Sequence, residues 1–437
     1  MSRIIPDSVP SGAPLPEKVD VVVIGGGIVG VCTALFLAER GVSVALCEKG
    51  LIAGEQSGRN WGWVRQMGRD PAEIPLAMDS LSLWRGMNER IGDETGFRPT
   101  GIAYLCRDAK QEAHYESWLG QARAYGVDTR MVRGAELDRL MPGMAAGFTA
   151  AAHTPSDGRS EPFKAAPAIA RAAIRAGAHV LTGCAVRTVE RSAGRVSGVV
   201  TERGTVACGT VVLAAGAWSR LFAGNLGIDF PQLKILGTVA RATAVDGVPD
   251  MPVGADNFAF RRRVDGSFSI AMRNANIAPI VPDSFRLFAD FMPTLVKSWG
   301  ELTLRINGRF VQEWKTPRSW SADAISPFER NRILDPVPHE RFNRGGYDNL
   351  VKAFPAFAQS RITQSWAGLI DVTPDAVPVL GPVDAVPGLH IASGLSGHGF
   401  GIGPGAGKLM ADMIMGGNMR IDPTPFRFDR FSKRKAA

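Results

Sequence analysis

The chain has 437 residues, of which 45% are hydrophobic and 21% charged; this exceeds what one hydrophobic core usually organises, so we expect two domains. Its formal net charge is +8, but the basic residues are mostly scattered and accompany no nucleic-acid-binding motif, which argues against a nucleic-acid partner. The 5 cysteines form no C-x-x-C pair and the 6 histidines show no ligand spacing, so the sequence predicts no metal site and a cytoplasmic protein.

Residues 1–18 contain four prolines and no apolar stretch, which indicates a flexible N-terminal arm and not a signal peptide. The segment 21–38 that follows carries no charge over 18 residues, which is long enough for a membrane span. Three consecutive glycines, Gly25 to Gly27, interrupt it. We therefore expect no transmembrane segment.

Residues 21–46 have the pattern of a strand, a helix and a second strand. Val21 to Ile24 is an apolar, β-branched run, Ile28 to Arg40 has helical character and ends at Gly41, and Val42 to Leu46 is the next strand. Uninterrupted apolar strands joined in this way are typical of a parallel sheet that is covered on both faces.

The turn between the first strand and the helix carries the spacing Gly25-x-Gly27-x-x-Gly30. Gly25 makes the turn, Gly27 lets a pyrophosphate approach the backbone, and Gly30 lets helix and strand pack closely. Glu48, 18 residues beyond Gly30, can accept hydrogen bonds from an adenosine ribose and would repel a 2'-phosphate. The unit predicts a dinucleotide without a 2'-phosphate and leaves NAD and FAD open.

A polar, glycine-rich loop follows at residues 54–63. Ser57, Arg59 and Asn60 place a hydroxyl, a guanidinium and an amide within four residues, and Trp61 and Trp63 argue against a fully solvated loop. Such a loop can wrap a pyrophosphate and reach an isoalloxazine ring, although an ordinary surface loop is the alternative.

Further elements are expected along the rest of the chain. They are amphipathic helices over 76–150, a helix over 162–176, a strand at 179–181, a hairpin over 186–205, a strand at 211–214, an antiparallel sheet from 231 to about 315, a strand at 388–393 and a helix over 405–415. They predict two domains, each assembled from discontinuous pieces.

A second glycine-rich turn, Ser393 to Pro404, lies between the last predicted strand and helix. A helix N-terminus presents free N–H groups and a partial positive charge. It would stabilise the negative charge that collects at N1 and O2 of a reduced flavin, which gives a reason for a second such turn far from the first.

With these motifs the sequence resembles the D-amino-acid oxidase superfamily of flavoproteins, which includes glycine oxidase, sarcosine oxidases, D-amino-acid dehydrogenases and opine oxidase subunits. The resemblance spans about residues 19–431 and rests on segments 21–48, 57–62, 156–158, 211–219, 366–381 and 397–407. It implies an α/β fold, with a Rossmann-type FAD-binding domain and a discontinuous α+β substrate domain built on an antiparallel sheet. It also favours FAD over NAD.

The same resemblance divides the chain. After the arm at 1–18, the FAD-binding domain is expected to comprise 19–75, 151–225 and 350–437, and the substrate domain 76–150 and 226–349. FAD is expected to be non-covalent, because no cysteine follows Cys208 to attach it as in monomeric sarcosine oxidase.

Motif and resemblance together predict a set of cofactor-binding residues. They are Gly25, Gly27, Ile28, Val29, Gly30, Glu48, Lys49, Ser57, Arg59, Asn60, Trp61, Gly62, Val186, Gly216, Trp218, Gly397, His398, Gly399, Phe400 and Gly401. Val186 is expected near the adenine, Gly216 and Trp218 near the dinucleotide, and Gly397 to Gly401 along the flavin ring.

The activity that the resemblance implies is oxidation of a C–N bond by hydride transfer to flavin N5, giving an imine that hydrolyses. The substrate is expected to be a small amino acid or N-alkyl amino acid. Three alternatives stay open: a subunit of an opine- or sarcosine-type dehydrogenase with partner chains, an enzyme for a non-carboxylated amine, and a non-catalytic or NAD-linked Rossmann protein. The sequence leaves open whether oxygen or another molecule accepts the electrons from the reduced flavin.

Four residues are candidates for the substrate site. Family members place an arginine after the W-A-G-x segment to hold a substrate carboxylate, but here Ile370 and Asp371 stand there. Arg65 and Arg273 are then the candidate carboxylate anchors, since a guanidinium matches a carboxylate in shape. His398 is expected to contact flavin or substrate. Asp371 meets either a substrate ammonium or a nearby turn that it caps.

Overall fold

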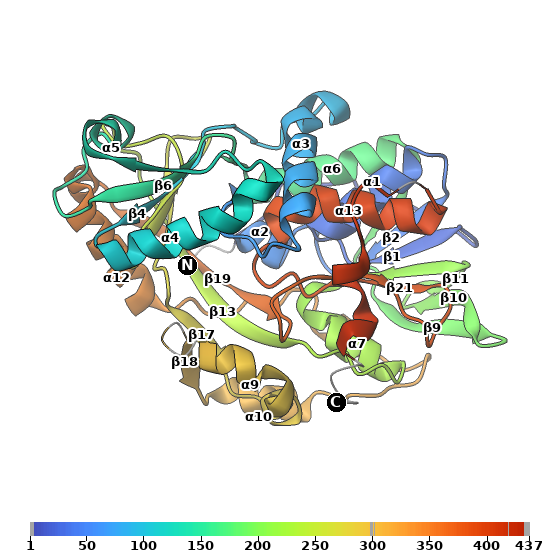
Figure 1. The fold of residues 1–437 in the computed structure, drawn as a ribbon. Helices are drawn as coiled ribbons and strands as arrows, with labels where there is room; N and C mark the ends of the chain where they lie inside the picture. The colour runs from blue at the N-terminus through green and yellow to red at the C-terminus, as the bar shows by residue number, and fades with distance from the viewer. Residues whose placement is uncertain (1–3, 298–299, 301, 418, 432–437) are drawn as a thin grey trace.

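The protein is described here by a computed structural model that covers residues 4–297, 300, 302–417 and 419–431. A six-stranded sheet forms the centre of one half (Figure 1). Its order is β20 (Val379–Pro382), β21 (Leu389–Ser393), β12 (Thr210–Leu213), β1 (Val21–Ile24), β2 (Val44–Glu48) and β8 (His179–Thr182). All neighbours run parallel except β20 and β21. The predicted parallel sheet is confirmed.

The two faces of this sheet are covered differently. Val21 and Val23 of β1 pack into a core with α1 (Ile28–Ala38), α6 (Pro162–Arg175) and α13 (Gly399–Met415). Val22 and Ile24 face the other core, which includes the three-stranded sheet β9 (Val186–Ser192), β10 (Arg195–Thr201) and β11 (Gly204–Ala207). The predicted hairpin is therefore present, with β11 as a third strand.

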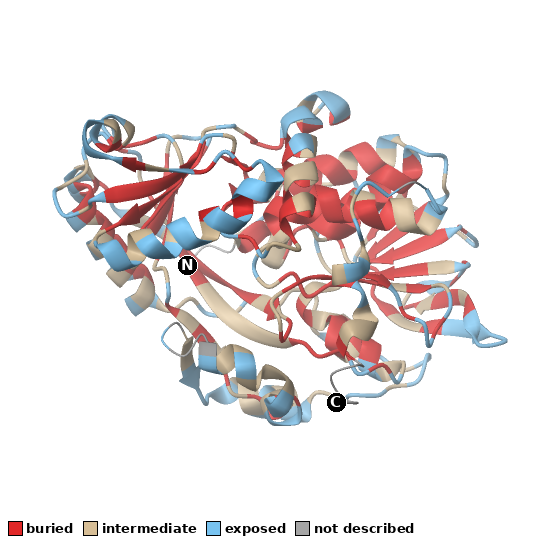
Figure 2. Cartoon of the chain, in the orientation of Figure 1, coloured by how far each residue is buried: buried red, intermediate tan, exposed pale blue. Residues whose placement is uncertain are grey.

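Helix α1 is buried along its whole length, as Figure 2 shows. This burial explains why the uncharged segment 21–38 is apolar, since a helix surrounded by protein needs no polar face. Gly30 lies where the helix crosses the turn: a Cβ atom there would stand 2.0 Å from the carbonyl oxygen of Gly25. Within the described part of the chain, no helix is long and apolar enough to cross a membrane.

A second, larger sheet fills the other half. Its order is β18 (Leu302–Arg305), β17 (Asn276–Pro279), β13 (Leu233–Ala242), β16 (Phe268–Ala271), β15 (Ala259–Arg262), β14 (Val253–Gly254), β4 (Ile102–Cys106), β6 (Ala150–Thr154) and β5 (Arg130–Arg133), and β19 (Ile362–Val372) pairs with β13. Most pairs are antiparallel, as predicted for 231–315, but β4 with β14 and β17 with β18 are parallel. The pairing of β13 with β19 extends over almost the full length of both strands.

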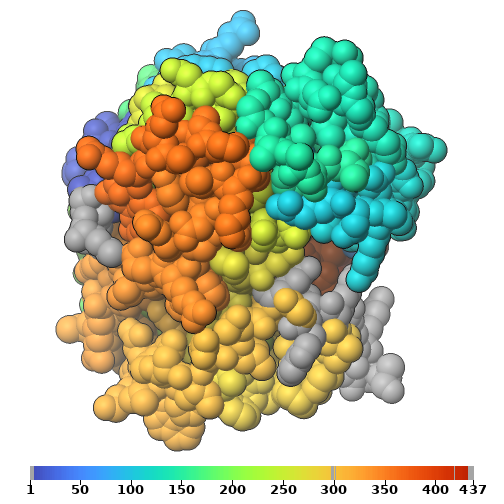
Figure 3. All heavy atoms as spheres, turned by 90° about the vertical axis from the view of Figure 1, so that its left-hand side faces the viewer, coloured from blue at the N-terminus to red at the C-terminus, as the bar shows by residue number. Residues whose placement is uncertain are grey.

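The prediction of helices throughout 76–150 is wrong in part. Helices α3 (Ile74–Ile91), α4 (Ala109–Ala122) and α5 (Gly134–Leu140) are present, but β4, β5 and β6 lie between them. Short apolar runs such as β4 cannot be assigned to strand or helix by periodicity, and the alanines of β6 favour a helix until the sheet pairs with them. In Figure 3 this segment (cyan to teal) lies beside α12 (Glu340–Ala353, orange) on one end of the molecule.

Three helices also interrupt the predicted antiparallel stretch. α8 (Pro282–Arg286) and α9 (Phe288–Lys297) precede β18, and α10 (Gly308–Lys315) follows it, forming a layer at the lower edge in Figure 1. Phe285, Phe288 and Trp314 of this layer are more than half exposed. Pro282 and Pro293 obscure α8 and α9 in the sequence, because proline is usually a signal of broken structure.

The division into domains stays a prediction. β19 comes from the segment 350–437 that we assigned to FAD binding, yet it pairs with β13 of the large sheet. In the predicted arm, Asp7 N–H donates to Phe163 O at 3.0 Å and the Asp7 carboxylate lies 3.1 Å from Lys164 Nζ, so that part of it lies against α6. Residues 1–3 and 432–437 of the predicted segments lie outside the described residues.

A buried ion pair joins the large sheet to the loop before α6. Arg261 Nη1 lies 2.6 Å from Glu161 Oε1, and both side chains are almost fully buried. Arg261 Nε also donates to Trp61 O at 2.6 Å. Arg263 reaches the same carboxylate at 3.5 Å, whereas Arg262 lies over the Phe268 ring. The run Arg261 to Arg263 thus alternates between two sides, as a strand requires, and serves this structural pair.

We predict that Glu161→Ala lowers the free energy of unfolding by about 3–5 kcal/mol, because it leaves the Arg261 guanidinium buried without its anion. Urea unfolding followed by circular dichroism measures the loss. Glu116→Ala is the matched control, since Glu116 pairs with Arg133 on the surface and its removal should cost less than about 1 kcal/mol. Equal losses in the two variants would contradict the structural role of Glu161.

Candidate functional site

A cavity of about 800 Å³ lies between the two sheets. Its wall includes the β1–α1 turn, the end of β2, the loop 53–65, the β13 and β19 strands and the turn before α13. All predicted cofactor and substrate residues line this cavity except Gly30 and Gly62. Gly30 has the packing role expected of it, whereas Gly62 lies behind the wall against Ser160 O and the Arg261 guanidinium.

The glycine fingerprint forms one end of the cavity. Glu48 Oε2 accepts from Gly26 N–H and its Oε1 from Gly50 N–H, both at 2.7 Å, and burial raises the pKa of this carboxyl. Ile28 N–H donates to Ser57 Oγ at 2.9 Å, which ties the loop to the first turn of α1. A Cβ atom on Gly27 would find, among the described residues, only the Ser57 hydroxyl within 4 Å. The space above Gly27 therefore suits a pyrophosphate.

An unpredicted carboxylate, Glu55, organises the wall beside this end. Its oxygens accept from Lys49 Nζ at 2.6 Å, from Trp218 Nε1 at 3.0 Å and from Leu334 N–H at 3.0 Å. Lys49 Nζ also stands 4.6 Å from the centre of the Trp218 ring. Lys49 and Trp218, which the sequence places far apart, thus meet through Glu55. Only the fold brings in residue 334, so no local pattern could have identified this cluster.

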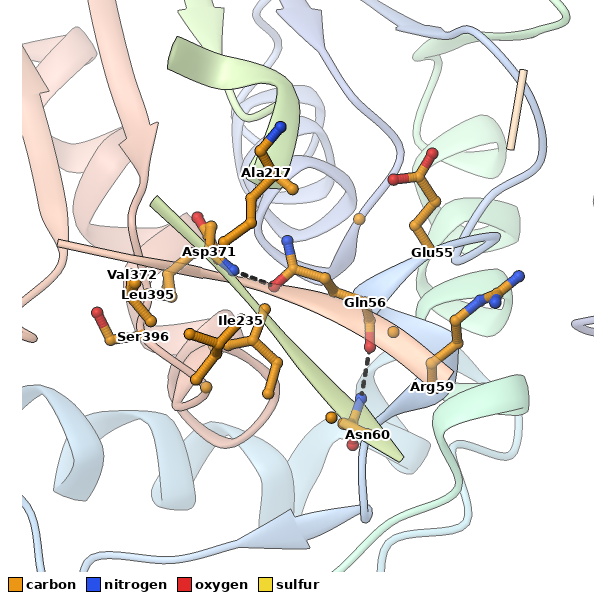
Figure 4. A pocket seen from close by; sticks show the side chains of 18 of the residues that line it. Glu55, Gln56, Arg59, Asn60, Ala217, Ile235, Asp371, Val372, Leu395 and Ser396 are labelled. Carbon is orange, nitrogen blue, oxygen red and sulfur yellow. Dashed lines mark hydrogen bonds between the residues drawn. The ribbon is translucent and has the colours of Figure 1, made fainter. Parts of the chain in front are cut away.

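The loop after Ser57 is held mainly by its own side chains. Asn60 Nδ2 donates to Ser57 O and Asn60 Oδ1 accepts from Gly62 N–H, both at 2.8 Å. Arg59 binds Asp335 Oδ1 at 2.5 Å and Ala367 O at 2.9 Å. Through these contacts Arg59 and Asn60 shape the wall of the cavity. Figure 4 shows Arg59 on α2 (Gln56–Arg59) and Asn60 directly after its last residue.

The second glycine-rich turn is present between β21 and α13. The helix begins at Gly399, six residues before the predicted start, so that its N-terminal amides lie at the turn 397–401. Gly397, Gly399 and Gly401 line the cavity together with Phe400. This places a helix N-terminus in the wall, as the prediction for a reduced flavin requires.

Asp371 supports this turn from β19. Its Oδ2 accepts from Gly394 N–H at 2.7 Å and from Gln232 Nε2 at 3.0 Å, and burial raises the pKa of its carboxyl. Its own N–H donates to Gln56 Oε1 at 3.2 Å, a bond drawn in Figure 4. The structure thus gives Asp371 the turn-capping contacts that were the second of its two predicted roles. Gln56 and Gln232 were missed, because a lone glutamine carries no sequence signal.

His398 stands at the start of α13 and contacts an unpredicted acid. Its Nδ1 lies 3.1 Å from Oε2 of Glu73, which is fully buried. Burial and the nearby Arg69 hold the pKa of His398 below its usual value. Burial alone would raise the pKa of Glu73, but the neighbouring His398 and Arg69 outweigh burial, so the pKa of Glu73 is lowered. The pair links the turn to the start of α3.

Arginines gather at the other end of the cavity. The guanidinium carbons of Arg65 and Arg273 stand 5.8 Å and 4.5 Å from the centre of the same Tyr104 ring. Arg273 Nη1 also donates to Ala255 O at 3.0 Å, and Arg65 donates to Met67 O. A third cation, Arg69, lines this end and was missed, although it follows Arg65 by four residues. The cavity thus joins a dinucleotide end to a cationic, aromatic end.

This arrangement can bind a flavin dinucleotide and an anionic small molecule in one space. Trp63 and Tyr104, with ring centres 5.5 Å apart, and Phe400 are nearly buried around the cationic end. Such aromatic walls keep water from a reacting C–H bond. In the part of the chain that the structure covers, no group of three or more His, Cys, Asp or Glu is placed to hold a metal ion.

Comparison with known proteins gives three findings. The family model described as "FAD dependent oxidoreductase" (DAO) matches residues 20–413. Glycine oxidase from Pseudomonas aeruginosa is 27% identical and covers 93% of this chain and 97% of its own length. The mitochondrial sarcosine dehydrogenase of Mus musculus is 26% identical over 97% of this chain, which spans only 42% of that longer relative.

Among solved structures, L-amino acid deaminase from Proteus myxofaciens, in complex with anthranilate, superposes with a TM-score of 0.94. It is 37% identical and covers 98% of this chain and 97% of its own. The likeness confirms the predicted fold class.

We predict that Glu48→Ala weakens retention of FAD by about 1–3 kcal/mol, the usual loss when a charged partner of buried hydroxyl groups is removed. The flavin content after extensive dialysis, read from absorbance, measures this change. Glu190→Ala, an exposed site on β9 away from the cavity, is the control. Unchanged flavin content in Glu48→Ala would remove Glu48 from the cofactor site.

Proposed function

The chain belongs to the family of FAD-dependent oxidoreductases, and from this premise we propose that it oxidises the C–N bond of a small amino acid or N-alkyl amino acid. The observation that carries the proposal is the cavity in which Arg65 and Arg273 meet at the Tyr104 ring and the turn 397–401 lies beside Arg65, since a Cβ atom on Gly401 would stand 3.5 Å from Arg65 N. A substrate held by its carboxylate at the arginines would place its amine carbon toward that turn.

The cofactor residues fit FAD. Backbone N–H groups and the open space at Gly27 suit the pyrophosphate, Glu48 suits the adenosine ribose, and the α13 N-terminus suits the flavin ring. When bound, FAD supplies the two-electron acceptor for the C–H bond next to nitrogen. The product of such an oxidation is an imine, which water hydrolyses.

In this proposal the protein's main task is to position the substrate. An arginine binds the carboxylate by paired, charge-assisted hydrogen bonds. His398, whose pKa is held below its usual value by burial, lies at the turn where it orients the substrate or flavin, and Glu73 fixes its ring. Trp63, Tyr104 and Phe400 exclude water around the reacting carbon. The proposal needs no strong general base.

One relative was solved with anthranilate, which combines an amine and a carboxylate, and this supports a carboxylated amine as the substrate class. We also propose that the electrons pass to oxygen or to another acceptor, which a partner subunit can supply. Copurification of a second chain with the protein from its source, followed by a rise in turnover when the chain is restored, would support a subunit of a larger dehydrogenase.

We predict that the purified protein is yellow and that acid or heat releases intact FAD, because the glycine fingerprint, the loop at Ser57 and the turn 397–401 line one cavity and no cysteine follows Cys208 to attach the flavin. Chromatography of the supernatant after precipitation identifies the flavin. A flavin that stays with the precipitated chain would contradict this prediction.

We predict that either Arg65→Met or Arg273→Met removes the carboxylate anchor. That variant should lower kcat/KM for amino acids by a factor equivalent to about 2–4 kcal/mol, since a buried carboxylate loses its cation. A decarboxylated amine should be nearly unaffected, because it never made the ion pair. Steady-state kinetics with each acid and its amine measure the difference. Both variants should keep FAD. If neither variant discriminates between acid and amine, a non-carboxylated amine becomes the better substrate.

A further inference from the structure

Residues 331–335 connect α11 (Pro327–Arg330) to α12 and form neither helix nor strand. Phe328 of α11 is buried in the core that includes β9 and β10, so the segment starts from a firmly packed helix. Its next residues reach the cofactor cavity, because Arg332 and Ile333 both line it. Neither residue was predicted to belong to the cofactor site. The segment therefore forms a part of the cavity wall that has no secondary structure of its own.

Two charged side chains of the cavity wall hold this segment by its backbone. Lys49 Nζ donates to Asn331 O at 2.9 Å and to Arg332 O at 3.0 Å. Glu55 Oε1 accepts from Leu334 N–H at 3.0 Å, and Lys49 and Glu55 also contact each other at 2.6 Å. An ammonium group has three N–H donors, so these three acceptors use all of them. Lys49 and Glu55 thus fasten the segment near both of its ends.

The charged side chains of the segment are also paired outside it. Arg332 donates to both carboxylate oxygens of Glu202 and, at 3.1 Å, to Lys49 O. Asp335 Oδ1 lies 2.5 Å from Arg59 Nη1. Residues 331–334 are half-buried and Asp335 is exposed. A segment held by a few polar contacts, and not by a helix or a sheet, opens at a lower free-energy cost than the core beneath it.

Two glycines let the segment lie directly on the wall. A Cβ atom on Gly50 would stand 2.3 Å from Arg332 O, and one on Gly54 would stand 3.6 Å from Ile333 Cδ1. Gly50 does not have a left-handed φ, so its own conformation does not require glycine. The close approach of the segment does. Gly50 also donates to Glu48, so the segment lies next to the carboxylate that suits the adenosine ribose.

We propose that residues 331–335 are a strap that closes over the adenosine end of bound FAD, with Lys49 and Glu55 as the positioning residues that hold it. The strap rests on Lys49 and Gly50, which directly follow Glu48. FAD enters and leaves this end of the cavity when the strap opens. Loosening the strap therefore speeds both release and uptake of the cofactor. The inference concerns FAD alone and does not depend on which amine is oxidised.

The rates of FAD release and uptake by the full-length protein test the strap. Release is measured by diluting the FAD-loaded protein and separating it from free flavin at intervals. Uptake is measured from the quenching of tryptophan fluorescence when FAD is added to the apoprotein. A return to the full flavin content shows that the apoprotein is intact.

Glu55→Ala removes the acceptor of Leu334 N–H and the anion beside Lys49. Both rates should rise at least about tenfold, as expected for the loss of charge-assisted hydrogen bonds. Glu55→Gln should give intermediate rates, because its amide oxygen can still accept from Leu334 N–H. Glu190→Ala, the exposed site on β9, should keep the wild-type rates.

Two further variants reach the strap by other routes. Gly50→Ala places a methyl group against Arg332 O and should also raise both rates. Its matched control is Gly209→Ala, because a Cβ atom on the exposed Gly209 would find nothing within 4 Å. Asp335 lies outside the described lining of the cavity, so an effect of Asp335→Ala passes through the strap. We expect a rise of about two- to fivefold there, since this ion pair is partly exposed.

The two rates together decide the outcome. Faster release without faster uptake in Glu55→Ala would show a damaged wall and would overturn the strap, as would wild-type rates in both Glu55→Ala and Gly50→Ala. If Glu55→Ala does not fold, Gly50→Ala and Asp335→Ala answer the question by the same two rates. A wild-type protein that binds FAD but oxidises no amine would contradict the proposed function alone, since the strap is measured by flavin binding.

Discussion

Two carboxylates at strand ends hold the loops that shape the cofactor cavity. Glu48, at the end of β2, accepts from Gly26 and Gly50 N–H, and Asp371, near the end of β19, accepts from Gly394 N–H. Glycine-rich loops have few side chains with which to define their own conformation. Here the loop N–H groups donate to a carboxylate that is anchored in a sheet, and these hydrogen bonds fix the loop conformation. A low local dielectric strengthens each of them.

Charged side chains also set the chemistry of the other end of the cavity, where the arginines lie. There Glu73 contacts His398, and Asp157 accepts from the backbone of the Gln66 segment. Because Arg65, Arg69 and Arg273 all line this end of the cavity, its charge favours anionic ligands. Aromatic walls around it sharpen that selection, because excluding water strengthens ion pairing. The charges at this end would therefore both bind an anionic substrate and position it.

Several parts of the fold could be predicted because their signal is local. The β1–α1–β2 unit follows from a run of apolar residues, a glycine turn and a second run, and the predicted bounds agree to within two residues. The strands β4 and β6 could not be predicted in the same way. Their residues are apolar enough for either a helix or a strand, and the choice depends on partners such as β14, which lies about 150 residues away along the chain from β4.

By itself the sequence determined the dinucleotide fingerprint, Glu48, the second glycine turn and the arginines Arg65 and Arg273, since each rests on residue type and short spacing. Only the tertiary structure decided that Arg59 points to Asp335, that Asp371 caps a turn, that Arg261 pairs with Glu161, and that Glu55, Glu73 and Arg69 join the site. The physical reason is that a side chain's role depends on which partner reaches it. Those partners come from segments that only the packing of the two sheets brings together.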